Sequence, residues 1–234
     1  MQSRTLLSMC ALAALVGLVA FVPASVAQDA DPLADPRRTD EDRARDAGSK
    51  PLQVYGFFGI EPAMTVVDLM PGGGYNTHIL SNMMGDSGNL YAGPDRRGGL
   101  AARIESAGLD NVTVITGIGD IPAGSVDVIL TVRNLHDLEL NMDTAPVYAA
   151  YLAALKPGGI FGVVDARTTK EGADDGTHRI NQDYVIEKVT AAGFELVEAS
   201  EMLANPGDDY SKWEGQGERT QVDRMVLKFR RPTM

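Results

Sequence analysis

The stretch MTVVDLMPGGGYNTHILSNMM occupies residues 64–84 and has three parts. Its first seven residues, MTVVDLM, are mostly apolar and include one aspartate, which predicts a buried strand. The PGGG that follows breaks this run. The spacing of Ile79, Leu80 and Met83 then predicts a helix over Tyr75–Met84. A strand that passes through a glycine-rich turn into a helix is typical of the first unit of a parallel α/β sheet.

The rest of the chain continues this alternation. Four more apolar strands are predicted, at residues 89–93, 111–116, 125–132 and 159–166. Helices are predicted between and after them, at residues 96–107, 143–156 and 181–192. Two long alternating segments at 194–203 and 223–231 are joined by a polar loop without a helix, so we expect them to pair antiparallel. Apolar strands separated by helices predict an α/β fold with a mostly parallel sheet covered on both faces.

Composition excludes several classes of protein. Of 234 residues, 44% are hydrophobic and 23% charged, which is typical of a globular domain and not of a disordered chain. The 21 Lys and Arg against 32 Asp and Glu give a net charge of −11. Because an acidic surface repels phosphate backbones and anionic lipids, we expect no nucleic-acid partner. The one cysteine, Cys10, excludes a disulfide framework and a cysteine-ligated zinc site.

The N-terminus has the three parts of a secretory signal peptide. Arg4 supplies a basic start, residues 6–22 carry no charge, and Ser25-Val26-Ala27 offers small residues to a signal peptidase. We therefore predict a signal peptide at 1–27 and a periplasmic or secreted protein without stable membrane insertion. An uncleaved anchor helix is the alternative.

Residues 28–50 separate this leader from the main domain. Residues 28–36 are rich in Asp, Ala and Pro and are typical of a linker. Residues 37–47 alternate charge signs with almost no large apolar side chain, which predicts an exposed helix that packs weakly; a lid over a site is the alternative. The folded domain is then predicted at 51–234, beginning with a short helix at 51–60.

Ligands of an open α/β sheet bind at the carboxyl ends of its strands, so the residues that follow each strand are the candidates for a site. Gly72, Gly73 and Gly74 follow the first strand and let a ligand approach the backbone, beside the unpaired N–H groups of the next helix. A tight turn without a ligand is the alternative. The turn is not a dinucleotide fingerprint, because Thr77 stands where the third glycine would be.

Two carboxylates follow the next strands. Asp95 comes after the second strand, where a carboxylate can accept hydrogen bonds from two ribose hydroxyls. Asp120 comes after the third strand, where it can meet an adenine amino group. For both residues the alternative is an aspartate that simply forms a turn.

The polar string RNLHD follows the fourth strand. Asn134 and His136 in this string are well placed to orient or deprotonate a substrate nucleophile. The alternative is that they satisfy backbone groups of the loop. Asp165 and Arg167 follow the fifth strand and would project into the same cleft, unless they pair with each other.

The chain has three histidines. His78 falls inside the first helix of the sheet and is predicted to be structural. His136 and His178 with Asp165 are candidates for a divalent metal, but their spacing matches no metal motif, so we assign no metal. The chain contains no GxSxG elbow, P-loop or HExxH motif, which argues against the common hydrolases and kinases.

Four segments of the chain resemble one family. The strings VVDLMPGGGYNTHIL, DVILTVRNLHDL, LKPGGIFGVVDAR and YVIEKVTAAGFELVEASEMLANPGDD look like a bacterial family of predicted, often exported, class I S-adenosylmethionine-dependent methyltransferases. The resemblance covers residues 46–234. It implies a Rossmann-like seven-stranded, mostly parallel sheet with an antiparallel terminal strand and helices on both faces. It also implies that S-adenosylmethionine contacts Asp68, Gly72, Gly73 and Gly74. The active-site face implied by the resemblance lies near Asn134, His136 and Asp165.

Three positions depart from the usual pattern of class I methyltransferases. Met70 stands at the first glycine of the GxGxG turn. The carboxylate that usually ends the second strand falls at Pro94, so Asp95 comes one residue late, and Asp120 comes two residues after its usual position.

We therefore expect S-adenosylmethionine-dependent methyl transfer to a small-molecule or cell-envelope acceptor. The alternative from another class is a non-catalytic ligand-binding module on a degenerate methyltransferase scaffold. A nicotinamide-dependent oxidoreductase is disfavoured by Thr77 and by the terminal strand pair.

Overall fold

The computed structural model describes residues 31–96, 98–213 and 221–233. The predicted signal peptide lies outside these residues. Contacts between residues group Asp31–Met234 into one compact unit. Among the helices in the described part of the chain, none has the length and apolarity that a membrane span requires.

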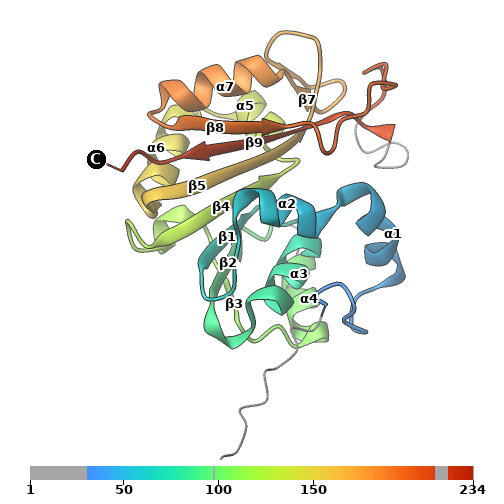
Figure 1. Ribbon diagram of the computed structural model, residues 1–234, viewed down its shortest axis with the longest axis vertical. Coiled ribbons are helices and arrows are strands. Elements are labelled where there is room, and N and C mark those ends of the chain that lie inside the picture. Colours follow the sequence, from blue (N-terminus) through green and yellow to red (C-terminus); the bar gives the residue numbers. More distant parts are fainter. Residues whose placement is uncertain (1–30, 97, 214–220, 234) are drawn as a thin grey trace, which may run out of the picture. The chain divides into compact units, whose positions relative to one another are not determined.

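A seven-stranded sheet with the order β3-β2-β1-β4-β5-β9-β8 forms the centre of this unit (Figure 1). Its strands in chain order are β1 (Thr65–Leu69), β2 (Asn89–Gly93), β3 (Val112–Val114), β4 (Val126–Val132), β5 (Leu155–Ala166), β8 (Glu195–Ser200) and β9 (Arg224–Arg230). The first five run parallel, and β9 is antiparallel to both of its neighbours, β5 and β8. The predicted α/β sheet with an antiparallel terminal strand is confirmed.

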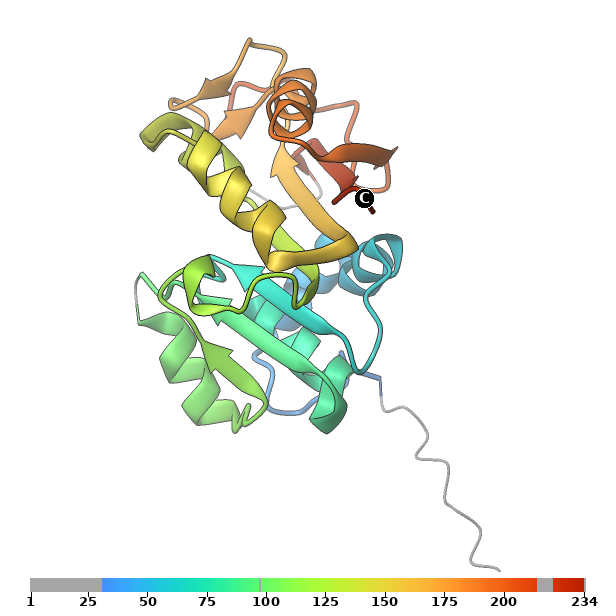
Figure 2. The ribbon, with the colours of Figure 1, turned by 90° about the vertical axis from the view of Figure 1, so that its left-hand side faces the viewer.

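Helices cover both faces of the sheet because the strand residues alternate between two apolar cores (Figures 1 and 2). The helices are α1 (Asp40–Ser49), α2 (Pro51–Phe58), α3 (Tyr75–Met84), α4 (Gly99–Ala107), α5 (Leu135–Asn141), α6 (Ala145–Ala154) and α7 (Gln182–Ala191). In β1, Val67 packs in the core beneath α5, α6 and α7, while Val66 packs in the core beneath α2 and α3. A separate two-stranded sheet joins β6 (Ala173–Asp174) to β7 (Arg179–Ile180).

The strand order reverses between β1 and β4. From β1 the chain builds outward through β2 to β3, and it then returns to place β4 on the other side of β1. Loops that leave the carboxyl ends of β1 and β4 therefore turn to opposite sides and open a crevice between them. This is the point of the fold at which a ligand site is expected.

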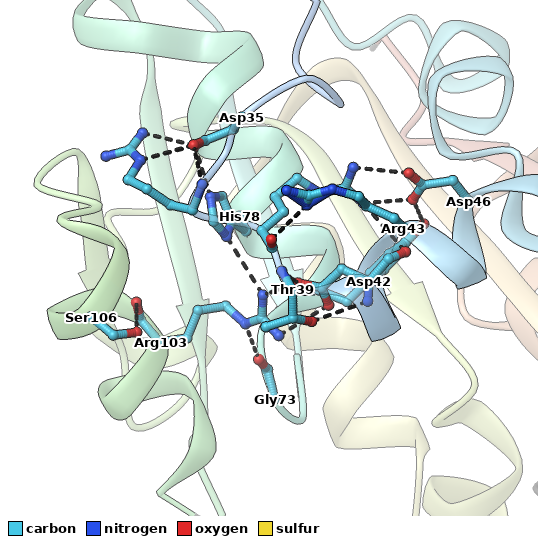
Figure 3. Close-up of polar contacts among 12 residues, drawn as sticks. Asp35, Thr39, Asp42, Arg43, Asp46, Gly73, His78, Arg103 and Ser106 are labelled. Atoms are coloured by element: carbon cyan, nitrogen blue, oxygen red, sulfur yellow. Dashed lines mark hydrogen bonds and ion pairs between the residues drawn. The ribbon is translucent and has the colours of Figure 1, made fainter.

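Helix α1 is exposed over half of its residues, as predicted, but the expectation that it packs weakly was wrong. Arg38 and Asp42 are buried, at 3% exposure each. Arg38 pairs with Asp46 within the segment (2.5 Å), whereas Asp42 pairs with Arg103 of α4 (2.5 Å). The hydroxyl of Tyr75 on α3 donates to Asp46 (2.7 Å). The alternating charges that suggested a solvated surface instead match partners within the segment and on α3 and α4 (Figure 3).

Candidate active site

A cleft of about 470 Å³ lies at the carboxyl ends of β1 and β4. Its walls come from the glycine turn after β1, from Pro94 after β2, from Arg45 of α1, and from five residues at and after the end of β4: Val132, Arg133, Asn134, His136 and Asp137. His178 and Trp213 complete it on the side of the two-stranded sheet. The volume lies within the range of about 300–1,000 Å³ that is usual for small-molecule sites.

The glycine turn borders this cleft with bare backbone. Gly72 and Gly73 line the cleft, and a Cβ atom added to either would meet no atom within 4 Å. Gly74 has a structural role. It is the N-cap residue of α3, with a φ of 75°, and its added Cβ would lie 2.9 Å from a side-chain carbon of Arg103. Of the three glycines predicted to contact a ligand, the structure therefore brings two to the cleft.

Arg103 of α4 holds the glycine turn in place (Figure 3). Its Nε donates to the carbonyl oxygen of Gly73, and its two terminal nitrogens pair with Asp42 of α1. The same guanidinium lies 3.5 Å from Nδ1 of His78, whose Nε2 is 2.9 Å from Asp35. Burial lowers the pKa of His78, which is outside the cleft lining and has the structural role predicted for it.

Asp68 lies at the carboxyl end of β1 and is fully buried. The hydroxyl of Thr77 donates to its Oδ2 (2.6 Å), while Oδ1 has no hydrogen-bond partner among the described residues. Burial raises the pKa of Asp68 to about 7, and the hydrogen bond from Thr77 opposes this rise. Since Asp68 also lines the cleft, its carboxyl group is suited to receive a proton or the positive charge of a ligand.

His136 and Asp165 form a buried pair at the ends of β4 and β5. Nδ1 of His136 lies 2.8 Å from Oδ1 of Asp165, and both side chains are at most 2% exposed. Asp165 also accepts hydrogen bonds from the backbone N–H groups of Leu135, His136 and Ala166. Because a carboxylate only accepts, Nδ1 carries the hydrogen and Nε2 is the basic nitrogen. The structure thus brings these two predicted site residues together, but Asp165 does not project into the cleft as expected, because it is not among the lining residues.

Two neighbours of this pair have structural roles. The amide of Asn134 donates to the carbonyl oxygens of Leu69 (3.3 Å) and Val132 (2.9 Å), so it ties the end of β1 to the end of β4 while lining the cleft. Arg167 does not pair with Asp165. Its ion pairs are with Glu201 (2.7 Å) and Asp223 (3.6 Å).

Neither Asp95 nor Asp120 lines the cleft. One oxygen of Asp95 accepts from the backbone N–H of Ala101 at the start of α4 (3.0 Å). Asp120 accepts from the backbone N–H and the hydroxyl of Thr116 (2.7 and 2.8 Å), and these bonds lower its pKa. Both carboxylates therefore make the turn contacts that were the alternative interpretation, and their contacts with adenosine stay a prediction.

Sequence reasoning missed Arg45 as a cleft residue. Its guanidinium lies 3.9 Å from the ring centre of Tyr75 and lines the cleft opposite the strand ends. Burial lowers its pKa. No sequence signal separated Arg45 from the other charged residues of α1. The alternative interpretation of this segment, a lid over a site, agrees with the place of Arg45 in the cleft lining.

Comparison with known proteins identifies the fold. No protein-family model matches the chain. The structure is similar to that of a SAM-dependent methyltransferase from Aquifex aeolicus (TM-score 0.60, 17% identity, covering 82% of this chain and 99% of that one). It is also similar to the [4+2]-cyclase SpnF (TM-score 0.59, 17% identity, 80% and 82% covered) and to an S-adenosylmethionine-dependent methyltransferase from Mesorhizobium loti (TM-score 0.54, 18% identity, 77% and 96% covered). The described part of this chain therefore has the Rossmann-like fold of class I methyltransferases.

Proposed function

We propose that the protein binds S-adenosylmethionine in the cleft and transfers its methyl group to a small-molecule or cell-envelope acceptor. The observation that carries this proposal is the oxygen of Asp68 without a hydrogen-bond partner among the described residues, in a cleft bordered by the bare backbone of Gly72 and Gly73. A buried carboxylate oxygen of this kind is costly unless a donor or cation meets it. S-adenosylmethionine carries both an ammonium group and a sulfonium.

The residues present fit this cofactor. Asp68 would accept a hydrogen bond from its amino group, and the bare backbone of Gly72 and Gly73 would allow close approach. Arg45 and Arg133 both line the cleft, and their guanidinium groups suit the carboxylate of the methionine part. When bound, S-adenosylmethionine supplies an electrophilic methyl group on its sulfonium sulfur.

His136 is the candidate general base. Its Nε2 would take the proton of the acceptor's nucleophilic group, while Asp165 holds Nδ1–H and stabilises the imidazolium that results. Asn134 would fix the loop that carries His136, because its amide joins the ends of β1 and β4. Arg45 and Tyr75 line the cleft and would shield part of a bound ligand from water.

A non-catalytic ligand-binding module remains the second candidate. Asp95 and Asp120 do not line the cleft, so the adenosine end of this site has neither of the two expected carboxylates. The fold itself does not decide between the two functions, since the [4+2]-cyclase SpnF shares it. Turnover with any acceptor would exclude this second candidate.

We also propose that the protein is exported and acts in the periplasm or outside the cell. This proposal rests on the basic start, apolar run and small-residue site within residues 1–27. The chain would then meet small-molecule or envelope acceptors and no nucleic acid, consistent with its net charge of −11.

Replacement of Gly73 by valine tests the proposed binding site. The backbone at Gly73 is not in the left-handed region and its Cβ would enter open space, so the variant is expected to fold. The branched side chain would occupy the cleft where the ligand approaches the turn. Affinity for S-adenosylhomocysteine, measured by calorimetry, should fall by more than about tenfold, or about 1.4 kcal/mol.

The matched control is Gly56→Val. Gly56 lies on α2, its added Cβ would also meet nothing within 4 Å, and it does not line the cleft. This variant should bind as the parent protein does. Equal affinity in the Gly73 variant and the parent would move the ligand away from the glycine turn.

A further inference from the structure

Three possible metal ligands meet at the edge of the cleft, on the side of α5 and the two-stranded sheet. They are the imidazoles of His136 and His178 and the carboxylate of Asp137, and each offers one ligand atom within 4.8 Å of those of the other two. His136 and Asp137 are adjacent on α5, while His178 comes from the turn between β6 and β7. Asp137 thus takes the place that the sequence suggested for Asp165 in such a cluster.

The distances within this cluster agree with a tetrahedral zinc site. Oδ1 of Asp137 lies 3.5 Å from Nε2 of His136 and 3.3 Å from Nδ1 of His178. Zinc binds nitrogen and oxygen ligands at about 2.0–2.1 Å, which puts neighbouring tetrahedral ligand atoms about 3.3 Å apart. The His178 side chain is 37% exposed, so neighbouring side chains do not enclose it and it can adjust its position relative to a cation.

His136 is already oriented as a metal ligand. Asp165 binds its Nδ1 at 2.8 Å, which favours the tautomer with a lone pair on Nε2 and restrains the ring. A carboxylate behind a metal-binding histidine is a common arrangement, because it raises the basicity of the ligand. The two carboxyl groups near this place, Asp137 and Asp165, suit the charge of a divalent cation.

The surroundings of His178 hold its imidazole towards the cluster. Its backbone is left-handed, with a φ of 52°, a conformation that few residues other than glycine adopt but that histidine, like asparagine and aspartate, adopts more often than most. The next residue, Arg179, is buried and pairs with Asp208 (2.8 Å) while donating to the carbonyl oxygen of Arg167. The His178 ring packs edge-to-face against Trp213, with 5.6 Å between the ring centres.

We propose that His136, Asp137 and His178 bind a divalent zinc-class cation, with its fourth coordination position open to the cleft. Three protein ligands and one open position are typical of catalytic zinc sites, in contrast to the four protein ligands of structural sites. Imidazole nitrogens and one carboxylate select zinc and its transition-metal neighbours over magnesium, which prefers oxygen ligands.

The role of this cation rests on the proposed function, although its binding does not. An acceptor hydroxyl or thiol at the open position would lose its proton to solvent, because the cation stabilises the anion. The oxygen or sulfur then forms a bond to the methyl carbon as the methyl–sulfonium bond breaks, and the electron pair remains on the sulfur of S-adenosylhomocysteine. In this arrangement Nε2 of His136 coordinates the cation and is not the base. The cation, in place of His136, then promotes loss of the acceptor's proton.

Zinc titration of the chelator-treated protein tests the site directly. Trp213 is the one tryptophan of the chain, so its fluorescence reports on the ring that it contacts, His178. We expect saturable 1:1 binding of Zn²⁺, a change in this fluorescence, and a visible Co²⁺ spectrum typical of tetrahedral coordination. Mg²⁺ at the same concentration should leave the fluorescence unchanged. Absence of saturable binding would overturn the proposal.

Two variants and one control assign the ligands. Asp137→Asn keeps the shape of the side chain but removes its charge, and His178→Gly removes an imidazole while relieving the left-handed backbone. Each should weaken Zn²⁺ binding at least about tenfold by competition with a chelating dye, while the thermal midpoint stays near that of the parent. Asp86→Asn, which alters an exposed carboxylate in the short turn after α3, should bind Zn²⁺ as the parent does. Parent-like affinity in either ligand variant would contradict the assignment.

Calorimetry with S-adenosylmethionine separates this proposal from the proposed function. Zn²⁺ binding without S-adenosylmethionine binding would support the metal site and contradict the proposed methyltransferase function. S-adenosylmethionine binding without Zn²⁺ binding would remove the metal site and leave His136 as the base.

Discussion

The buried carboxyl group of Asp68 should make cofactor binding depend on pH. Burial raises its pKa to about 7. A cationic ligand prefers the ionised carboxylate, so the affinity should fall as the pH drops below this value. Between pH 7 and pH 5 the ionised fraction falls from about one half to about one hundredth, and the apparent affinity for S-adenosylmethionine should therefore weaken about fiftyfold.

Calorimetry at pH 5, 6 and 7 measures this dependence, and buffers of different ionisation enthalpy count the protons released. Near pH 6 we expect close to one proton released for each cofactor bound. Asp68→Asn should bind more weakly than the parent at pH 7 but show little change down to pH 5. His136 and His178 also line the cleft and remain in this variant, so a full pH dependence in Asp68→Asn would assign the effect to them and refute the role of Asp68.

The same carboxyl group affects the free energy of unfolding. Its pKa is about 7 in the folded protein against an ordinary value of 3.8, so the unfolded chain releases this proton first as the pH rises. Its contribution therefore lowers stability between about pH 4 and pH 7, by up to about 4 kcal/mol at 1.36 kcal/mol for each unit of pKa shift. Urea unfolding should show Asp68→Asn gaining stability over the parent across this window. A constant difference between the two would contradict the shift.

Further predictions concern the candidate base, the glycine turn and the N-terminus. His136→Ala should lower turnover about a hundredfold or more, with cofactor affinity nearly unchanged, whereas His78→Ala should lose only stability. Turnover is measured with any acceptor found by screening. Turnover of the His136 variant equal to that of the parent would contradict the role of His136 as base. Arg103→Ala should weaken S-adenosylhomocysteine binding about tenfold, because the glycine turn loses its clamp, and unaltered calorimetric affinity would argue against this. Protein purified from its native host should begin near Gln28 by N-terminal sequencing, and an intact Met1 on cytosolic protein would reject export.

The fold could be predicted from the sequence because the spacing of apolar residues and the positions of glycine and proline indicated the same elements. The helix predicted at Tyr75–Met84 and the strand predicted at Asn89–Gly93 have those bounds in the structure. Helix α5 (Leu135–Asn141) was not predicted, since it is one short helix inside a polar string. The two-residue strands β6 and β7 are too short to give a periodic signal.

The sheet positions the predicted site residues beside the ends of its strands. Asp68 and Asp165 are each the second-last residue of a strand, and His136 lies on α5 just after β4. Asp68 and His136 line the cleft, whereas Asp165 lies behind His136 and does not line it. Asp95 and Asp120 lie in loops, where one or two residues decide whether a carboxylate faces the ligand or caps the turn.

Side chains that reach the cleft from distant segments left no signal in the sequence. Arg45 reaches it from the N-terminal helix, and His178 reaches it from a turn. Both depend on tertiary packing: α1 is anchored through Asp42 to Arg103, and the His178 turn is anchored through Arg179 to Asp208.

Titration of the protein with S-adenosylmethionine at pH 7.5, with NAD as the comparison ligand, decides whether the cleft is a methyl-donor site. We expect 1:1 heat of binding for S-adenosylmethionine and for its product S-adenosylhomocysteine, and none for NAD, because the glycine turn lacks a dinucleotide fingerprint. Binding of NAD, or no binding of either methionine-derived ligand, would contradict the proposed function.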